Sequence, residues 1–390
     1  MKRVVVLAVG VVLAGAGAIV RSGPESDQPT MSIEGPRAAD LGPRATPPPR
    51  PEPPSPKPEA HLDLDKLQLV GDHYEAPLGA KPVALTLDPE LQQLAEQLLD
   101  KAHAPRGAIV AMTPDGKILA LAGRRSDDPK GVHDGKPDWR LATEAWAPAA
   151  SVFKLVTASA LVAAGVDPDA PVCYHGGIRS VLESNLRDDK RDNDCKSLAW
   201  GVAHSNNAIV GKLAFQHLQP ATLAGTARDL FGEIALPMPA RFGELELPDT
   251  HDLALAQAAA GFSGSKLSVL GGALLAATFA NAGARPAARL VAEAADPGLH
   301  RVLPDAVARA VARMMVGTCR DGSAAKSFGR HATAVAGKTG TLARTEPFYM
   351  EHSWFVGYAP ADHPQIVVSV LLGNPEDWQL RGQEAARALV

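Results

Sequence analysis

The sequence predicts an α+β fold, in which an antiparallel sheet flanked by helices forms a three-layer lobe and an all-α lobe is inserted into it. This prediction rests on the order of the strand-like and helical segments along the chain. Strand-like segments occur at 107–112 and 117–122, before a long helical middle, and at 353–358 and 365–372, after it. Because a sheet buries its apolar face against helices, strands from both ends of the domain are expected to share one sheet.

The N-terminus has the pattern of an export signal. Met1–Arg3 is basic, Val4–Val20 is apolar, and Arg21 closes the run. Residues 1–21 are therefore expected to be a signal peptide or a signal anchor, and the length of the apolar run slightly favours the uncleaved anchor. This predicts a single-pass protein of the cell inner (cytoplasmic) membrane with its globular part in the periplasm, or a secreted protein if the segment is cleaved.

Residues 22–60 are expected to form a linker. They contain 12 of the 33 prolines, and such a stretch favours an extended, semi-rigid polyproline conformation over a packed core. The linker would hold one globular domain, residues 61–390, away from the membrane.

Composition argues against nucleic-acid and metal binding. The formal net charge is −4 and no long Lys/Arg stripe occurs, so nucleic acid is not an expected partner. The chain has no CxxC motif and no His/Cys cluster, so no metal or other cofactor is expected.

Cys173 and Cys195 flank a polar segment and are candidates for a disulfide in an oxidising compartment, which would leave Cys319 free.

Local signals define the elements of the globular part in order. Asp88 and Pro89 are a typical N-cap and first residue of a helix. The two strands that follow are joined by the turn Thr113-Pro-Asp-Gly116. Residues 124–145 are charged and loop-like. Helical patterns then cover 151–165, 196–218 and 252–282, and the chain ends in a helix, Glu376–Leu389.

Three short motifs occur in order: Ser151-Val-Phe-Lys154, Ser205-Asn-Asn207 and Lys338-Thr-Gly340. Each is weak by itself, and a serine before an apolar helix is more often a helix cap than a nucleophile. Two further Ser-x-x-Lys matches exist, Ser263–Lys266 and Ser323–Lys326. Only Ser151 precedes both other motifs and opens a long apolar helix, which singles it out.

The first motif suits nucleophilic catalysis. The N–H groups and the dipole at a helix N-terminus stabilise an oxyanion that forms beside the serine. Lys154 lies three residues after Ser151, so its side chain shares a helical face with the hydroxyl. Apolar neighbours would lower the pKa of Lys154 towards neutrality and make it a usable base.

The third motif suits substrate binding. Gly337 and Gly340 fit an edge strand along which a substrate backbone passes closely. Lys338 and the neighbouring hydroxyls would suit a carboxylate. The alternative interpretation is a polar strand edge with a solvated lysine.

The three motifs together resemble those of the penicillin-binding protein transpeptidases, whose fold is shared with β-lactamases. The likeness extends to four longer segments and covers about residues 80–375: Leu85–Gln93, Gly107–Met112, Ala203–Asn207 and His352–Pro360.

The resemblance implies a role for each motif residue. Ser151 would be acylated, Lys154 would take its proton, Ser205 would relay a proton to the leaving amine, and Asn207 would orient Lys154 and the substrate amide. Lys338, Thr339, Gly340 and Thr341 would hold the substrate carboxylate. The backbone N–H groups of Ser151 and Thr341 would form the oxyanion hole.

The resemblance also implies substrates and partners. These are peptidoglycan stem peptides ending in D-Ala-D-Ala, β-lactams as covalent inhibitors, other cell-wall synthesis proteins, and the membrane through the N-terminal segment. The expected reaction is D,D-transpeptidation. A D,D-carboxypeptidase, a serine β-lactamase, and a non-catalytic β-lactam sensor or wall-synthesis scaffold are the alternatives. Glu244 and Glu246 lie roughly where a β-lactamase carries its deacylating base, but no Glu-x-x-Leu-Asn pattern follows them.

Two segments depart from the family pattern. Ala149–Ala150 stands before Ser151, where many members carry Pro-Gly, and Gly261-Phe-Ser-Gly264 replaces a Gly-rich segment containing Thr-Pro. Both affect the expected shape of the site rather than its chemistry.

Overall fold

The computed structural model describes residues 60–390, except 127, 130–134, 178 and 347. The predicted signal segment, 1–21, and all of the predicted linker, 22–60, except Ala60 lie outside the described residues. Within the described part, no helix combines the length and the apolar character needed to span a membrane.

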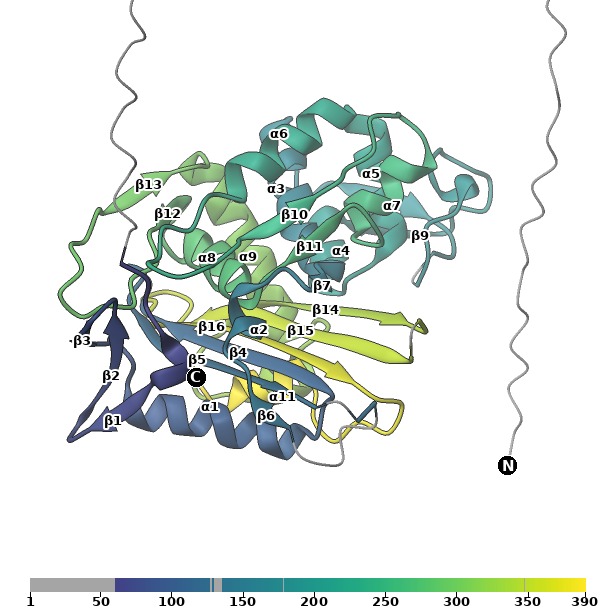
Figure 1. Ribbon diagram of the computed structural model, residues 1–390. Helices are drawn as coiled ribbons and strands as arrows, with labels where there is room; N and C mark the ends of the chain where they lie inside the picture. Colours follow the sequence, from purple (N-terminus) through teal and green to yellow (C-terminus); the bar gives the residue numbers. More distant parts are fainter. Residues whose placement is uncertain (1–59, 127, 130–134, 178, 347) are drawn as a thin grey trace, which may run out of the picture. The chain divides into compact units, whose positions relative to one another are not determined.

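A six-stranded antiparallel sheet forms the base of the domain (Figure 1). Strands from the two ends of the domain meet at its centre, where Val370 pairs with Ile109, as the sequence predicted. In spatial order the strands are β14 (Ala336–Arg344), β15 (Met350–Ala359), β16 (Ile366–Asn374), β4 (Arg106–Met112), β5 (Ile118–Arg125) and β6 (Lys136–Pro137).

Helices cover both faces of this sheet. On one face, α1 (Pro89–Ala102) and α11 (Gly382–Arg387) share an apolar cluster with Ile109 and Val370. On the other face, α8 (Val269–Ala280) packs against the alternate residues, such as Val110 and Leu371. Side chains alternate between the faces of a strand, and burial on both faces explains the continuous apolar run of β4.

A mostly helical lobe lies above the face of the sheet that α8 covers (Figure 1). It contains α3 (Lys154–Ala163), α4 (Leu198–Ala203), α5 (Asn207–His217), α6 (Pro220–Leu230) and α7 (Leu253–Ala260). The remaining helices are α2 (Arg140–Thr143), α9 (Asp305–Arg320) and α10 (Ala325–Phe328), with 3-10 turns η1 (Leu64–Lys66), η2 (Ala150–Phe153) and η3 (Glu183–Asn185). The predicted α+β class with an inserted helical lobe is confirmed.

Four small sheets complete the fold of the described residues. An N-terminal sheet contains β1 (Gln68–Val70), β2 (His73–Leu78) and β3 (Lys81–Ala84), and another contains β7 (Ala147–Pro148), β10 (Gly243–Leu245) and β11 (Ser265–Leu267). Two hairpins pair β8 (Pro171–Tyr174) with β9 (Asp194–Ser197), and β12 (Ala284–Pro286) with β13 (Leu299–Arg301).

Several helix predictions were wrong in extent. The predicted helix 196–218 is broken between α4 and α5, where Ser205 adopts a left-handed conformation with φ of 58°. The predicted helix 252–282 is broken after α7, because Gly261 and Gly264 have positive φ and lead into β11. The C-terminal helix is only Gly382–Arg387, and the predicted loop 124–145 contains β6 and α2.

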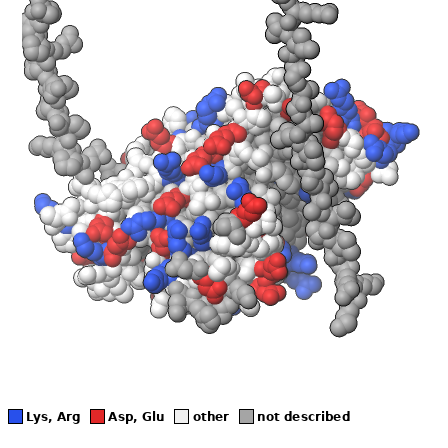
Figure 2. Space-filling model, turned by 45° about the vertical axis from the view of Figure 1, so that its right-hand side comes forward, with Lys and Arg blue, Asp and Glu red and all other residues white. Residues whose placement is uncertain are grey.

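The pairing of the cysteines is as expected. Cys173 and Cys195 form a disulfide between β8 and β9, and Cys319 is free and buried in α9. On the face shown in Figure 2, basic and acidic side chains are interspersed rather than gathered by sign.

Candidate active site

Ser151 lies in the 3-10 turn η2, directly before α3. The sequence predicted that Ser151 would open a helix, with a capping role as the alternative interpretation; in the structure the N-cap positions of η2 and α3 are Ala149 and Phe153. Oγ of Ser151 lies 2.7 Å from Nζ of Lys154, within hydrogen-bond distance. Ala150 has a φ of 49°, a left-handed conformation that favours glycine. A glycine at position 150 would adopt this φ with less strain than alanine.

Lys154 is completely buried behind Ser151. Its Nζ also donates to Oδ1 of Asn207 at 2.7 Å and to the carbonyl oxygen of Ala260 at 2.7 Å. A carbonyl and an amide oxygen can only accept, whereas a serine hydroxyl can also donate. A neutral Lys154 therefore gives its two hydrogens to Asn207 and Ala260 and directs its lone pair at the Ser151 hydroxyl.

The electrostatics of the site favour this neutral form. Burial lowers the pKa of Lys154 well below its usual value, and the positive charge of Lys338 lowers it further. Removing an ammonium from water disfavours its charged state, and a second nearby cation adds to this effect. The lowered pKa predicted from the apolar neighbours is thus confirmed in direction.

Ser205 and Lys338 form a second linked pair. Ser205 lies in the turn between α4 and α5, and Nζ of Lys338 donates to its Oγ at 3.0 Å and to the carbonyl oxygen of Thr339 at 2.9 Å. Lys338 is fully buried, so the alternative of a solvated lysine was wrong. Burial lowers the pKa of Lys338 to about 7.

Strand β14 presents the third motif at the border of the sheet. It is the last strand on its side of the sheet in the described chain, as the glycine pattern predicted. A β-carbon at Gly340 would lie 3.2 Å from Cγ2 of Val152 and 3.1 Å from Cβ of Trp354. A β-carbon there would be crowded by both neighbours, so Gly340 favours the close approach of β14 to the turn that carries Ser151.

These elements surround a cleft of about 740 Å³. Its walls include five of the residues predicted from the motifs: Ser151, Ser205, Asn207, Thr339 and Thr341. Lys154 and Lys338 lie buried behind this lining. The assignment of the oxyanion hole to the N–H groups of Ser151 and Thr341 stays a prediction, and both residues line the same cleft.

The cleft also contains residues that the sequence did not single out. Ser323 was set aside as a chance Ser-x-x-Lys match, yet its Oγ lies 2.6 Å from Oγ1 of Thr339. Its backbone N–H donates to the carbonyl of Ala203 at 3.0 Å, two residues before Ser205. The other unpredicted lining residues that carry polar side chains are Arg179, Glu351, Arg381 and Gln383. Only their position in space reveals them.

The remaining sequence candidates lie outside this lining. Lys266 of the Ser263 match pairs with Glu244 at 2.7 Å, and the two residues lie opposite each other on the paired strands β10 and β11. Neither Glu244 nor Glu246 is among the residues that line the cleft. Within the described residues, no group of three His, Cys, Asp or Glu side chains is arranged to hold a metal ion.

Comparison with known proteins agrees with this geometry. The family model "Penicillin binding protein transpeptidase domain" matches residues 107–390. The chain is 28% identical over 341 residues to "Peptidoglycan D,D-transpeptidase PbpA" of Mycobacterium tuberculosis, covering 76% of this chain and 68% of the relative.

Solved structures show the same fold. Penicillin-binding protein A from M. tuberculosis, as its imipenem acyl-enzyme complex, is 26% identical with a TM-score of 0.62, covering 79% of this chain and 78% of that one. The D,D-transpeptidase domain of a peptidoglycan glycosyltransferase from Eggerthella lenta is 26% identical with a TM-score of 0.61, covering 79% and 81%. With the matched family model spanning most of its length, the chain belongs to the penicillin-binding protein transpeptidase domain family.

Proposed function

We propose that the chain is a serine D,D-transpeptidase that cross-links peptidoglycan stem peptides through an acyl-enzyme at Ser151, and that β-lactams acylate the same serine. Family membership and relatives named peptidoglycan D,D-transpeptidases support the activity. The observation that carries the proposal is the set of three hydrogen bonds at Nζ of the buried Lys154, which leaves its lone pair for the Ser151 hydroxyl.

Acylation would proceed in two steps. Oγ of Ser151 attacks the carbonyl carbon of the penultimate D-alanine while its proton passes to Nζ of Lys154. The resulting oxyanion is held by the N–H groups of Ser151 and Thr341. The C–N bond then breaks, and the hydroxyl of Ser205 relays the proton held by Lys154 to the departing amine of the terminal D-alanine. In deacylation an amine of a second stem peptide attacks the ester carbonyl, its proton passes to Oγ of Ser151 as the C–Oγ bond breaks, and the serine is regenerated.

The terminal carboxylate would bind along β14. Lys338 supplies the positive charge, Thr339 and Thr341 supply hydroxyl donors, and Gly340 lets β14 lie close to the turn that carries Ser151. Ser323 lies within hydrogen-bond distance of the Thr339 hydroxyl. By donating to the Thr339 oxygen, Ser323 would direct the hydroxyl hydrogen of Thr339 towards the carboxylate. A charge-assisted hydrogen bond of this kind is stronger than a neutral one.

The sequence outside the described residues completes the proposal. We propose that residues 1–21 anchor the chain in the cell inner membrane, or are cleaved, and that the Pro-rich linker places the transpeptidase domain on the periplasmic side. Other cell-wall synthesis proteins are proposed partners there.

A fluorescent penicillin tests the nucleophile. We expect a stable covalent adduct on the wild type and none on Ser151→Ala. Ser263→Ala is the matched control, because Ser263 starts another Ser-x-x-Lys sequence but is absent from the cleft lining, and it should label normally. An unlabelled wild type would contradict the proposal, and an adduct lost within seconds would indicate a β-lactamase.

Product analysis separates transpeptidase from carboxypeptidase. Purified protein is incubated with a pentapeptide stem and an excess of an amine acceptor, and the products are identified by mass spectrometry. A cross-linked dimer with release of one D-alanine is expected. Tetrapeptide alone would indicate that water is the acceptor.

A further inference from the structure

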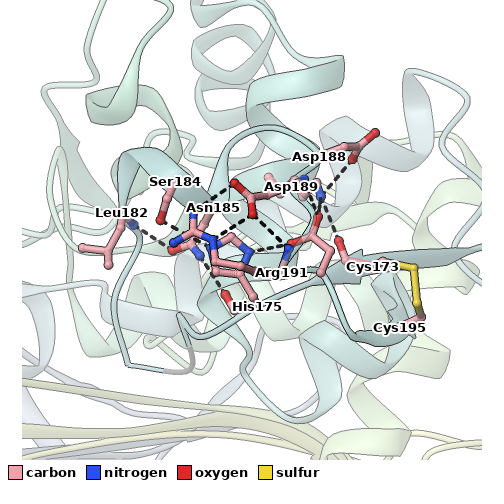
Figure 3. Close-up of polar contacts among 11 residues, drawn as sticks. Cys173, His175, Leu182, Ser184, Asn185, Asp188, Asp189, Arg191 and Cys195 are labelled. Carbon is pink, nitrogen blue, oxygen red and sulfur yellow. Dashed lines mark hydrogen bonds and ion pairs between the residues drawn. A yellow bond between two sulfur atoms is a disulfide. The ribbon is translucent and has the colours of Figure 1, made fainter.

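A disulfide joins the two ends of a polar segment in the mostly helical lobe. The bridged segment is defined here as the described residues between Cys173 and Cys195, namely 174–177 and 179–194. Figure 3 shows its charged side chains gathered next to the disulfide. One of its residues, Arg179, lines the catalytic cleft, so the segment contacts the site as well as the surface.

The bridged segment binds α5 through a buried lysine. The side chain of Lys212 is only 1% exposed, and its Nζ donates to the carbonyl of Cys173 at 2.8 Å and pairs with Asp192 at 2.7 Å and Asp188 at 2.9 Å. Burial by itself would lower the pKa of Lys212, but the two carboxylates outweigh it and raise the pKa. The lysine is thus charged, and the segment supplies its counterions.

Asp192 is held from the other side by the segment itself. Its carboxylate lies 2.6 Å from Nδ1 of His175 and accepts from the backbone N–H of Asp189 at 3.1 Å. Burial would raise the pKa of Asp192, but its hydrogen bonds with His175 and Lys212 lower it. A buried ion pair with these additional hydrogen bonds fixes one geometry.

The segment contacts α5 a second time, next to a motif residue. The N–H of Ala208 donates to the carbonyl of Gly177 at 3.0 Å, and a β-carbon at Gly177 would lie 2.6 Å from Cβ of Ala208. Ala208 directly follows Asn207. The N-terminal turn of α5 is therefore packed against the bridged segment.

The segment also packs against α7. Buried Val181 and Leu186 form a separate apolar cluster with Ala256 and Ala260 of α7. Ala260 provides the carbonyl that accepts from Lys154. The two helices held by the bridged segment are thus those that carry Asn207 and Ala260, the two partners of Lys154 besides Ser151.

From these contacts we propose that the bridged segment positions the general base: it holds α5 and α7 so that Asn207 and Ala260 bind Lys154, and opening the disulfide slows acylation of Ser151. This inference rests on the proposed function. A two-stranded hairpin such as β8–β9 is marginally stable by itself, and a disulfide restricts the conformations of the open segment. Of the bridged segment's residues, only Tyr174 belongs to the main core, so most of that core is formed by other parts of the chain.

Loosening the segment has a specific electrostatic consequence. Asn207 and the carbonyl of Ala260 are neutral, and the charged group that acts on Lys154 is Lys338 of β14. Arg179 of the segment, Glu351 of β15 and Arg381 line the same cleft. When water reaches Lys154, its ammonium is better solvated, so its pKa rises and less of the neutral base remains at neutral pH.

The test compares the oxidised and reduced wild type. The second-order rate of acylation by a fluorescent penicillin is measured against pH, with and without a thiol reductant, and the cysteine state is checked by mass spectrometry. We expect reduction to slow acylation at neutral pH about tenfold, corresponding to a tenfold smaller neutral fraction of Lys154. The acidic limb of the profile should move to higher pH.

Cys173→Ala/Cys195→Ala is the matched variant. It should behave like the reduced wild type and be insensitive to the reductant, which excludes an effect of the reductant on other groups. Should this variant fail to fold, Val181→Ala loosens the contact with Ala260 while the disulfide stays intact, and it should shift the profile in the same direction.

The outcomes distinguish the two proposals. If the reduced protein is acylated at the same rate with the same profile as the oxidised protein, the positioning role is wrong. A slower rate with an unmoved acidic limb contradicts it equally, because the segment would then only stabilise the fold. If the oxidised wild type is not acylated at any pH, the proposed function itself fails.

Discussion

Gly261 lies in direct contact with the carbonyl group of Ala150. A β-carbon at Gly261 would lie 2.0 Å from the Ala150 oxygen and 3.2 Å from the nitrogen of Ser151. The residue before Gly261 is Ala260, whose carbonyl accepts from Lys154. The end of α7 therefore touches both the turn that carries Ser151 and the side chain of Lys154.

This contact predicts a severe effect of Gly261→Ala. The substitution is strained by the φ of 91° and also displaces the Ala150 carbonyl, so we expect a loss of about 2–4 kcal/mol in the free energy of unfolding and a much slower acylation of Ser151. Gly165→Ala is the control, because Gly165 has the same φ of 91° but nothing within 4 Å of its β-carbon. It should cost only about 1 kcal/mol and leave acylation unchanged. Equal losses in both variants, measured by denaturant unfolding, would contradict the packing argument.

A carboxylate placed beside Lys154 should keep this lysine protonated at neutral pH, so that it cannot act as a base. In Asn207→Asp, the oxygen that now accepts from Lys154 at 2.7 Å would carry a negative charge and raise the pKa of that lysine. We expect acylation at pH 7 to slow about tenfold or more and to recover as the pH rises.

Asn206→Asp is the matched control for this charge. The side chain of Asn206 caps α5 by accepting from the N–H of Ile209 at 3.0 Å, and Asp is an equally good cap. Its pH profile should stay close to that of the wild type. A flat response of Asn207→Asp to pH would show that Lys154 is not the base.

Substrate binding should weaken as the pH rises through the pKa of Lys338, which burial lowers to about 7. Below this pH Lys338 is an ammonium that attracts a carboxylate, and above it the charge is lost. We expect the apparent affinity for a penicillin to fall by up to about tenfold per pH unit on the alkaline side. The methyl ester of the same penicillin lacks the carboxylate and should not show this dependence. The same alkaline decline with the ester would contradict the assignment.

Ser323 should matter only for substrates with a carboxylate. Ser323→Ala removes the partner of the Thr339 hydroxyl, and one hydrogen bond of about 1 kcal/mol corresponds to about a fivefold lower acylation efficiency with penicillin. Ser323→Thr restores a hydroxyl and should recover most of it. The measurement is the acylation efficiency of each variant with penicillin and with its methyl ester. A similar loss with the ester would reduce Ser323 to a structural residue.

The thiols provide a direct check of the disulfide. Burial raises the pKa of the Cys319 thiol, so the native protein should not react with a thiol reagent. Unfolding without reductant should expose one thiol, and unfolding after reduction should expose three, because the chain has three cysteines. Three reactive thiols in the unreduced, unfolded protein would exclude the Cys173–Cys195 bridge.

Features that depend on nearby residues followed from the sequence. The hydrogen bond between Ser151 and Lys154 joins residues three apart, and one helical turn suffices to bring them together. The strands β4, β15 and β16 were predicted from their apolar runs. These runs are apolar because side chains on both faces of the sheet are buried under helices. The order of the three motifs then indicated which of the three Ser-x-x-Lys sequences belongs to the site.

Other features depend on packing between distant segments, and only the tertiary structure decided them. The partners of Lys154 at Asn207 and Ala260 are 53 and 106 residues away, and Lys338 meets Ser205 across 133 residues. No local pattern marks the Ala260 carbonyl, because every residue has one. Ser323 had the same sequence pattern as the match at Ser263, and packing alone brought its hydroxyl to Thr339. The sequence by itself thus determined the three motifs that supply the proposed reacting groups, while the tertiary structure decided their partners and their pKa shifts, since burial and proximity arise only when distant segments pack together.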